Sequence, residues 1–149
     1  MLARGALIAA VYSAMTILLA PISYGPVQFR VSEALTLLPF YMPEAIPGLF
    51  IGCVFSNFYG GFGLPDMVFG GLATLIAAIL TRKSKNIYVG ALWPVVSNMI
   101  IIGVMLHVLI EVPLIATCIY VGLGEAGACY IVGVPLMKLL ERQNIICRD

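Results

Sequence analysis

Charged side chains are scarce in this sequence, and their scarcity indicates its broad class. Only 10% of the 149 residues are Asp, Glu, Lys or Arg, whereas 62% are hydrophobic and the mean hydropathy is +1.07. A soluble domain carries about 25% charged residues. The composition therefore predicts an integral membrane protein. The formal net charge of +1 provides no basic field that would attract nucleic acid.

Residue types that commonly carry catalysis or bind metals are also few. His107 is the single histidine, and the four cysteines are scattered without C-x-x-C spacing, so neither a zinc site nor a catalytic triad is expected. The stretch GGFGLPD lacks the lysine and the hydroxyl of a P-loop. We therefore expect no metal, no cofactor and no enzymatic activity, ATP hydrolysis included, in this chain.

The apolar runs predict a bundle of membrane helices in a single domain over residues 1–149. A helix needs about 20 apolar residues to cross a hydrocarbon core that is about 30 Å thick. Pro43 and Glu44 favour a break between two shorter segments, and the last run extends over about 30 residues, or roughly 45 Å. The runs cover residues 2–20, 32–42, 44–58, 67–81, 87–107 and the stretch beyond Pro113 that ends in KLLERQNIICRD.

The basic residues indicate how many times the chain crosses the membrane. Arg4, the Arg82 to Lys85 cluster and the C-terminal basic tail all fall on one face if there are six crossings. We therefore expect an all-α integral membrane protein with six transmembrane helices and both termini in the cytoplasm. Arg30 would then lie on the outer side, where this rule does not favour a positive charge.

The loop that contains Arg30 has two interpretations. Ser32 can cap the following helix, with Glu33 at the positive end of the helix dipole and Arg30 reaching a lipid phosphate. Alternatively, Gln28, Phe29, Arg30 and Glu33 form a lid over a ligand, because an aromatic ring, an amide, a guanidinium and a carboxylate allow both stacking and directional hydrogen bonds.

Polar residues inside apolar runs indicate a site, because a charge at the bilayer centre costs about 2.5 to 3.5 kcal/mol. Asn98 and Glu125 lie in the fifth and sixth runs, at depths that the sequence allows to coincide. Three interpretations remain open: a structural hydrogen bond between Asn98 and Glu125, a neutral protonated Glu125, or a buried Glu125 carboxylate that accepts the N–H donors of a ligand. Asn57 and Asp66 flank an outer turn and are candidates for helix caps or contact with water.

A stripe of small residues also has two interpretations. Ala6, Ala10 and Ala14 recur every four residues and flatten one side of the first helix, so a neighbouring helix can approach closely. That neighbour is either another helix of the same bundle or a partner protein. Gly48 and Gly52 begin a similar stripe in the third run.

The loop and two later segments resemble a known family. YGPVQFRVSEALTLLPF, then EAIPGLFIGCVFSNFYGGFGLPDMVFGGLATLIAAILT and the later GEAG are similar to the QueT family of substrate-binding (S) components of energy-coupling factor transporters. The resemblance implies a six-helix S component in the bacterial cytoplasmic membrane that captures a queuosine precursor. That precursor is a 7-deazaguanine such as the aminomethyl form or queuine. It also implies a transmembrane T component and two cytoplasmic ATPases as partners.

The resemblance suggests roles for the polar residues and for the alanine stripe. Glu125 would accept the adjacent N–H donors of the base while Asn98 donates to its carbonyl, Glu33 or another lid carboxylate would pair with a cationic arm, and Phe29 would cover the ring. The stripe would dock on the T component. The expected substrate-binding residues are Gln28, Phe29, Arg30, Glu33, Asn57, Asn98 and Glu125.

Two other functions remain open at the level of sequence. A solitary transporter would use Glu125 as a proton carrier and would work without ATPase partners. A structural membrane subunit would bind no nucleobase.

Overall fold

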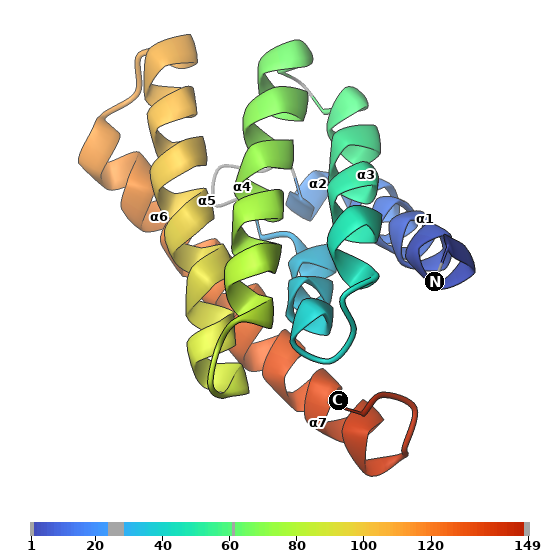
Figure 1. Ribbon diagram of the computed structural model, residues 1–149. Coiled ribbons are helices and arrows are strands. Elements are labelled where there is room, and N and C mark those ends of the chain that lie inside the picture. The colour runs from blue at the N-terminus through green and yellow to red at the C-terminus, as the bar shows by residue number, and fades with distance from the viewer. Residues whose placement is uncertain (1, 24–28, 61, 148–149) are drawn as a thin grey trace.

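The structure described here is a computed structural model, which describes residues 2–23, 29–60 and 62–147, and these residues form an all-α bundle (Figure 1). The predicted break is confirmed, because one helix ends at Phe40 and the next begins at Ala45. In chain order the helices are α1 (Leu2–Leu18), α2 (Ala20–Ser23), η1 (Val31–Phe40), α3 (Ala45–Phe58), α4 (Leu64–Arg82), α5 (Ile87–Ile110), α6 (Leu114–Ala126), η2 (Gly127–Gly133) and α7 (Val134–Arg142).

Three helices in the described part of the chain are long and apolar enough to cross a membrane. They are α4, α5 and the continuous stretch Leu114–Arg142, which joins α6, η2 and α7 over 29 residues and confirms the predicted long last helix. This stretch runs obliquely through the bundle in Figure 1, as its length requires. The fold is therefore that of a multi-pass helical membrane protein.

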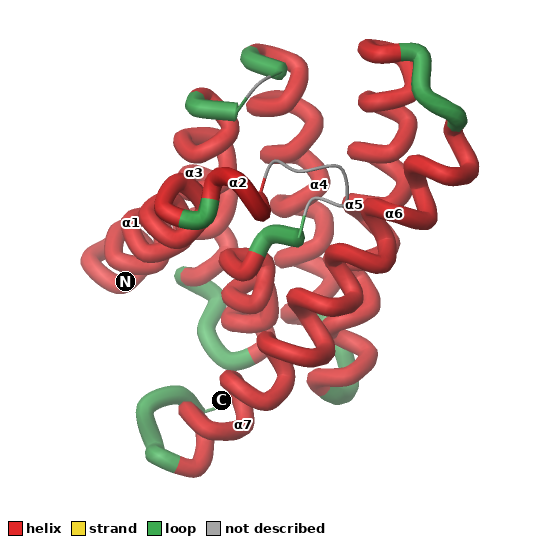
Figure 2. The backbone as a smooth tube through the Cα atoms, turned by 180° about the vertical axis from the view of Figure 1, so that it is seen from behind, coloured by secondary structure: helices red, strands yellow, loops and turns green. Residues whose placement is uncertain are grey.

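The short helix η1 lies at the centre of the bundle. It is a 3₁₀-helix of 10 residues, about 20 Å long at a rise of roughly 2.0 Å per residue, and every residue after Val31 is buried. In Figure 2 it is the short helix in the middle that follows the grey segment. It packs against α1, α3, α4, α5 and η2. Side chains that project from η1 therefore reach the other helices from inside the bundle.

Helix α1 packs very closely on α3. A Cβ atom on Gly48 would lie 2.5 Å from the carbonyl oxygen of Gly5, and one on Gly52 would lie 2.9 Å from that of Ala9. The Ser13 hydroxyl also donates to the Gly52 carbonyl at 3.0 Å. The Gly48 and Gly52 stripe therefore packs helices within this chain.

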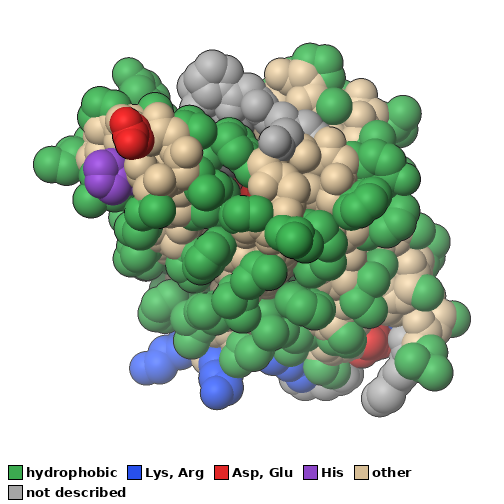
Figure 3. Space-filling view, turned by 90° about the horizontal axis from the view of Figure 1, so that it is seen from above, with side chains coloured by type: hydrophobic (Ala, Val, Ile, Leu, Met, Phe, Trp, Pro, Cys, Tyr) green, Lys and Arg blue, Asp and Glu red, His purple; other side chains and the backbone are tan. Residues whose placement is uncertain are grey.

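The basic segments gather at one end of the bundle, around the turn between η1 and α3. Arg4 Nη1 lies 3.3 Å from Glu44 Oε1, and Arg82 Nη1 donates to the Tyr41 carbonyl at 3.3 Å. The Tyr41 hydroxyl in turn donates to Glu141 Oε2 at 3.2 Å, close to the end of α7. Figure 3 shows Lys and Arg side chains along one edge of a face that is otherwise mostly hydrophobic.

Candidate functional site

Arg30 is the centre of a buried polar cluster. It has an extended backbone directly before η1, with φ −93° and ψ 103°, and its side chain points into the bundle, where the residue is 6% exposed. Nη1 donates to Asn57 Oδ1 at 2.9 Å, Nε donates to the Ser23 carbonyl at 3.4 Å, and Nη2 lies 3.7 Å from Asp66 Oδ2. The guanidinium therefore connects the end of α2 with α3 and α4.

Glu33 lies one turn further along, in the first turn of η1. It is 1% exposed, and its Oε1 atom accepts a hydrogen bond from the hydroxyl of the fully buried Tyr12. Its other oxygen, Oε2, is buried without a hydrogen-bond partner in the described residues. Arg30 lies within electrostatic reach of this carboxylate. Burying a carboxylate oxygen without a partner is costly, so this atom needs an explanation.

These contacts contradict two parts of the helix-cap interpretation of the loop, the Ser32 cap and the lipid-facing Arg30, whereas Glu33 does lie in the first turn of η1. The Ser32 hydroxyl lies 2.6 Å from Thr16 Oγ1 of α1, and the N-cap position directly before η1 is occupied by Arg30, which makes no side-chain cap hydrogen bond. Arg30 is buried and cannot reach a lipid phosphate. These two parts were wrong because they considered only local contacts, whereas α1 and α4 both pack against η1.

Asp66 and Asn57 belong to the same cluster. The expectation that Asp66 caps a helix or meets water is wrong, because the residue is 1% exposed and faces Arg30. Asn57 Nδ2 donates to the Asp66 carbonyl at 2.9 Å, while its Oδ1 accepts from Arg30. This arrangement needs Gly70, since a Cβ atom there would lie 2.3 Å from Asn57 Nδ2. Asn57 therefore positions both charged groups.

Glu125 approaches the cluster from α6. It is 5% exposed, its Oε2 atom is buried without a partner in the described residues, and it lies within electrostatic reach of Glu33 and Arg30. Asn98 is also 5% exposed, but its Nδ2 donates to the Pro94 carbonyl at 3.1 Å, one turn earlier in α5. In the described residues, the Asn98 amide nitrogen therefore bonds to the backbone of its own helix. The hydrogen bond between Asn98 and Glu125 that the sequence left open is not formed there.

The depth of Asn98 follows from the contacts between α5 and α6. Gly103 meets Cys118, and Gly122 meets Met99. Because the two helices are antiparallel, this register sets Asn98 level with position 123, which is two residues, or about 3 Å, from Glu125 along the axis. The two residues therefore share a depth, as the sequence suggested.

Phe29 covers one side of this region, where the last helix changes its winding. Its half-buried ring packs on Gly127, and a Cβ atom on that glycine would lie 2.8 Å from Phe29 Cε2. Gly127 begins the π-helical stretch η2, two residues after Glu125, and π-helical turns are frequent at functional sites. Gln28 lies outside the described residues. Phe29, Arg30, Glu33, Asn57 and Glu125 are thus in one region of the fold.

The sequence did not single out two residues of the cluster. Tyr12 looked like one of several tyrosines in apolar runs, and only its place on the face of α1 opposite the alanine stripe hinted at burial. Asp66 was set aside because it follows a glycine-rich turn. That these two residues contact the cluster depends on how α1 and α4 pack on η1, which no local pattern encodes.

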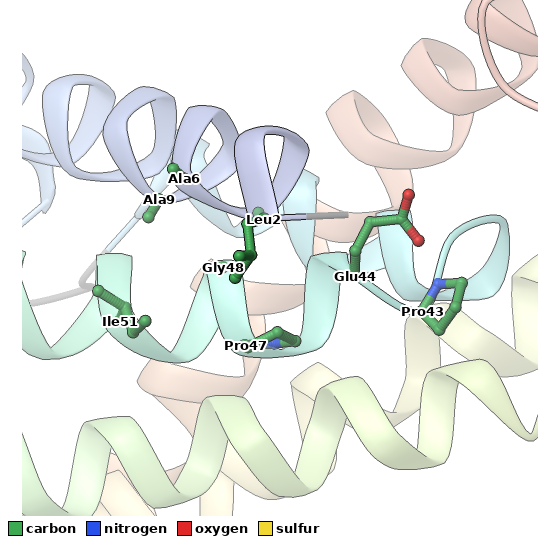
Figure 4. A pocket seen from close by; sticks show the side chains of 9 residues that line it. Leu2, Ala6, Ala9, Pro43, Glu44, Pro47, Gly48 and Ile51 are labelled. Carbon is green, nitrogen blue, oxygen red and sulfur yellow. The ribbon is translucent and has the colours of Figure 1, made fainter.

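The alanine stripe of α1 faces outward. Ala6, Ala10 and Ala14 are all exposed, so packing inside the bundle does not explain them. A groove of about 760 Å³ runs between α1 and the start of α3, with Ala6 on one wall and Ile51 on the other (Figure 4). A second groove of about 360 Å³, lined in part by Ala10 and Ala14, also adjoins Ile51. The stripe is therefore part of an apolar surface between α1 and α3.

Together these features define a class of protein. Charged groups enclosed by membrane-spanning helices are typical of proteins that bind and move a solute across the bilayer. In the described residues no group of three His, Cys, Asp or Glu side chains has the arrangement of a metal site. The fold and the site are those of a multi-pass membrane transport protein.

Comparison with known proteins identifies the family. The family model described as QueT transporter matches residues 2–142, and the chain belongs to this family. It is 32% identical, over 157 residues, to the queuosine precursor transporter QueT of Lactococcus lactis subsp. cremoris (strain MG1363), an alignment that covers 94% of this chain and 92% of the relative. No solved structure matches the chain. The family is one of transporters and not of enzymes.

Proposed function

We propose that this chain binds a queuosine precursor, a 7-deazaguanine such as 7-aminomethyl-7-deazaguanine or queuine, from the outer side of the bacterial cytoplasmic membrane. The observation that carries the proposal is the set of buried carboxylate oxygens without partners, one each on Glu33, Asp66 and Glu125, around the single guanidinium of Arg30. A 7-deazaguanine offers several N–H donors to such acceptors. The name of the Lactococcus relative supports this choice of substrate.

Each polar residue has a proposed role in binding. N1–H and the exocyclic amine of the base lie side by side, so the Glu125 carboxylate is suited to accept both, while the Asn98 amide donates to the neighbouring carbonyl. Glu33 or another carboxylate of the cluster pairs with the cationic arm. Phe29 covers the ring. Gln28 belongs to the same lid segment, and Asn57 holds Arg30 in place.

We also propose that the chain is the S component of an energy-coupling factor transporter. In this proposal the chain crosses the membrane six times, with both termini in the cytoplasm. The gathering of Arg4, Arg82 and Lys138 at one end of the bundle supports this topology. A T component docks on the exposed stripe Ala6, Ala10 and Ala14, and two cytoplasmic ATPases supply the energy.

A ligand panel tests the proposed substrate. The purified protein in detergent is titrated with 7-aminomethyl-7-deazaguanine, queuine and guanine, and its thermal midpoint and heat of binding are recorded. Because only the first two ligands carry a cationic arm, we expect them to stabilise the protein more than guanine does. Equal stabilisation by guanine, riboflavin and biotin would refute the proposal.

A solitary proton-coupled transporter is the second candidate. It is favoured by the buried Glu125 carboxylate, which has one oxygen without a partner and is of the kind that carries protons across membranes. Uptake of labelled 7-aminomethyl-7-deazaguanine is compared in cells that express the chain alone and in cells that also express a T component and both ATPases. We expect uptake only in the second case. Uptake by the chain alone, driven by a pH gradient, would favour the proton-coupled mechanism.

A further inference from the structure

The ion pair between Arg30 and Asp66 is left open on one side. Charge-assisted N–H···O bonds are about 2.7–2.9 Å long, but Arg30 Nη2 lies 3.7 Å from Asp66 Oδ2. The other carboxylate oxygen, Oδ1, is buried without a partner in the described residues. Because Arg30 also donates to Asn57 and to the Ser23 carbonyl, it compensates Asp66 only in part.

Ser23 contacts the same edge of the guanidinium and carries a second buried polar group without a partner. Nε and Nη2 form one edge of the planar fork; Nε donates to the Ser23 carbonyl and Nη2 faces Asp66. The Ser23 hydroxyl is fully buried, and its Oγ atom also lacks a hydrogen-bond partner in the described residues. Two residues that contact this edge of Arg30, Ser23 of α2 and Asp66 of α4, therefore each carry a buried oxygen without a partner.

The three carboxylates of the cluster come from different helices. Glu33 lies on η1, Glu125 on α6 and Asp66 on α4. Glu33 is also held by Tyr12 and, through its carbonyl, by the thiol of Cys129 in η2 at 3.7 Å. Glu33 and Glu125 thus belong to η1 and the last helix, whereas Asp66 belongs to α4 and, like the end of α2, contacts Arg30 directly.

The shape of a 7-deazaguanine requires two separate groups of acceptors. The N1–H and amine edge lies on the six-membered ring, and the substituent at C7 projects from the five-membered ring, away from that edge. A base whose donor edge meets Glu125 therefore directs its C7 arm away from Glu125. The unused acceptors of the cluster that lie outside η1 and the last helix are those of Asp66 and Ser23.

We propose that the Asp66 carboxylate, together with the Ser23 hydroxyl, receives the protonated amine of the C7 arm and thereby makes the site select cationic over neutral 7-deazaguanines. This inference rests on the proposed function and assigns the arm to Asp66 and not to Glu33. An ammonium group carries three N–H donors and a positive charge. The ammonium group thus supplies donors to Asp66 Oδ1 and Ser23 Oγ. It also adds a second positive charge to a cluster in which Arg30 faces three carboxylates.

The test compares two ligands that differ in the charge of the arm. Affinities for 7-aminomethyl-7-deazaguanine and the neutral 7-cyano-7-deazaguanine are measured by calorimetry on the purified full chain and on Asp66→Asn. We expect Asp66→Asn to reduce affinity for the aminomethyl ligand at least tenfold and affinity for the cyano ligand less than threefold. The matched control Glu111→Gln, at an exposed acid between α5 and α6, should leave both affinities unchanged.

The other outcomes are also decisive. An equal loss of both affinities in Asp66→Asn would overturn the inference, because Asp66 would then only position Arg30, while the proposed function would stand. If the wild-type chain binds neither ligand, the proposed function fails and the inference fails with it. Should Asp66→Asn fail to fold, the variant Ser23→Ala is measured instead. A threefold to tenfold loss of affinity for the aminomethyl ligand alone supports the inference. No loss of affinity, or an equal loss for both ligands, overturns it.

Discussion

Replacing Glu125 by glutamine should separate ligand binding from stability. The carboxylate is 5% exposed, and its Oε2 atom has no partner in the described residues. In the proposed complex its two oxygens accept two N–H donors of the base, whereas a glutamine offers one oxygen and turns an N–H group toward the second donor. A hydrogen bond to a charged group contributes about 1.5–3 kcal/mol. We therefore expect binding to weaken by about 10-fold to 150-fold.

The stability of the unliganded variant should change in the other direction. A buried carboxylate oxygen without a partner destabilises the unliganded protein, so Glu125→Gln should melt at the same temperature as the wild type or higher. Calorimetry with 7-aminomethyl-7-deazaguanine gives the affinity, and a thermal scan in the same detergent without ligand gives the midpoint. Glu111→Gln, in the exposed turn before α6, is the matched control for both measurements.

Two results would refute this reasoning about Glu125. Unchanged affinity in a folded variant would remove the residue from the site. A fall in the thermal midpoint together with a loss of affinity would show that the carboxylate supports the bundle, so that the lost binding is secondary. Only weaker binding at undiminished stability agrees with a group that is kept for the ligand.

The remaining predictions concern the docking surface and the support of the site. Ala10→Trp should abolish uptake while leaving binding intact, because the ring would fill the outer face of α1. The control Val11→Trp, at an exposed position on another side of the same helix, should retain uptake. Normal uptake by Ala10→Trp would refute the docking face. Gly70→Ala should weaken binding at least tenfold, since its Cβ would displace the Asn57 amide that holds the Arg30 guanidinium. In the control Gly71→Ala, the new Cβ meets only apolar side chains, so binding should be affected much less. Equal losses of affinity in calorimetry would refute this role of Gly70. Tyr12→Phe should lower the thermal midpoint, because it leaves a buried carboxylate without its donor at a cost of about 1–3 kcal/mol; an unchanged midpoint would contradict that.

Much of the fold follows from local features of the sequence. The apolar runs, the break at Pro43 and the length of the last helix were all predicted, because hydrophobicity and proline act through local chemistry. The 3₁₀ winding of η1 and the π-helical stretch at Gly127 were not. Gly133 lies directly against Ala34 of η1, and such a fit between two central helices depends on their packing.

The candidate site was predicted only in part. Arg30, Glu33 and Glu125 attracted attention because charge inside an apolar run is costly. Asp66 was missed, since a carboxylate in the first turn of a helix, after a glycine-rich segment, is usually explained by the helix dipole. Tyr12 was missed because a tyrosine in an apolar helix carries no sign of its partner.

The sequence by itself determined that this chain is a helical membrane protein, where its helices break and which few charges need compensation, because these properties depend on composition and on neighbouring residues. Only the tertiary structure decided that Arg30 points inward to Asn57 and Asp66 and that Tyr12 reaches Glu33. These contacts join segments far apart in the chain. They form because the short central helix η1 brings its buried face against α1 and α4, and the partners of a buried charge are set by that packing.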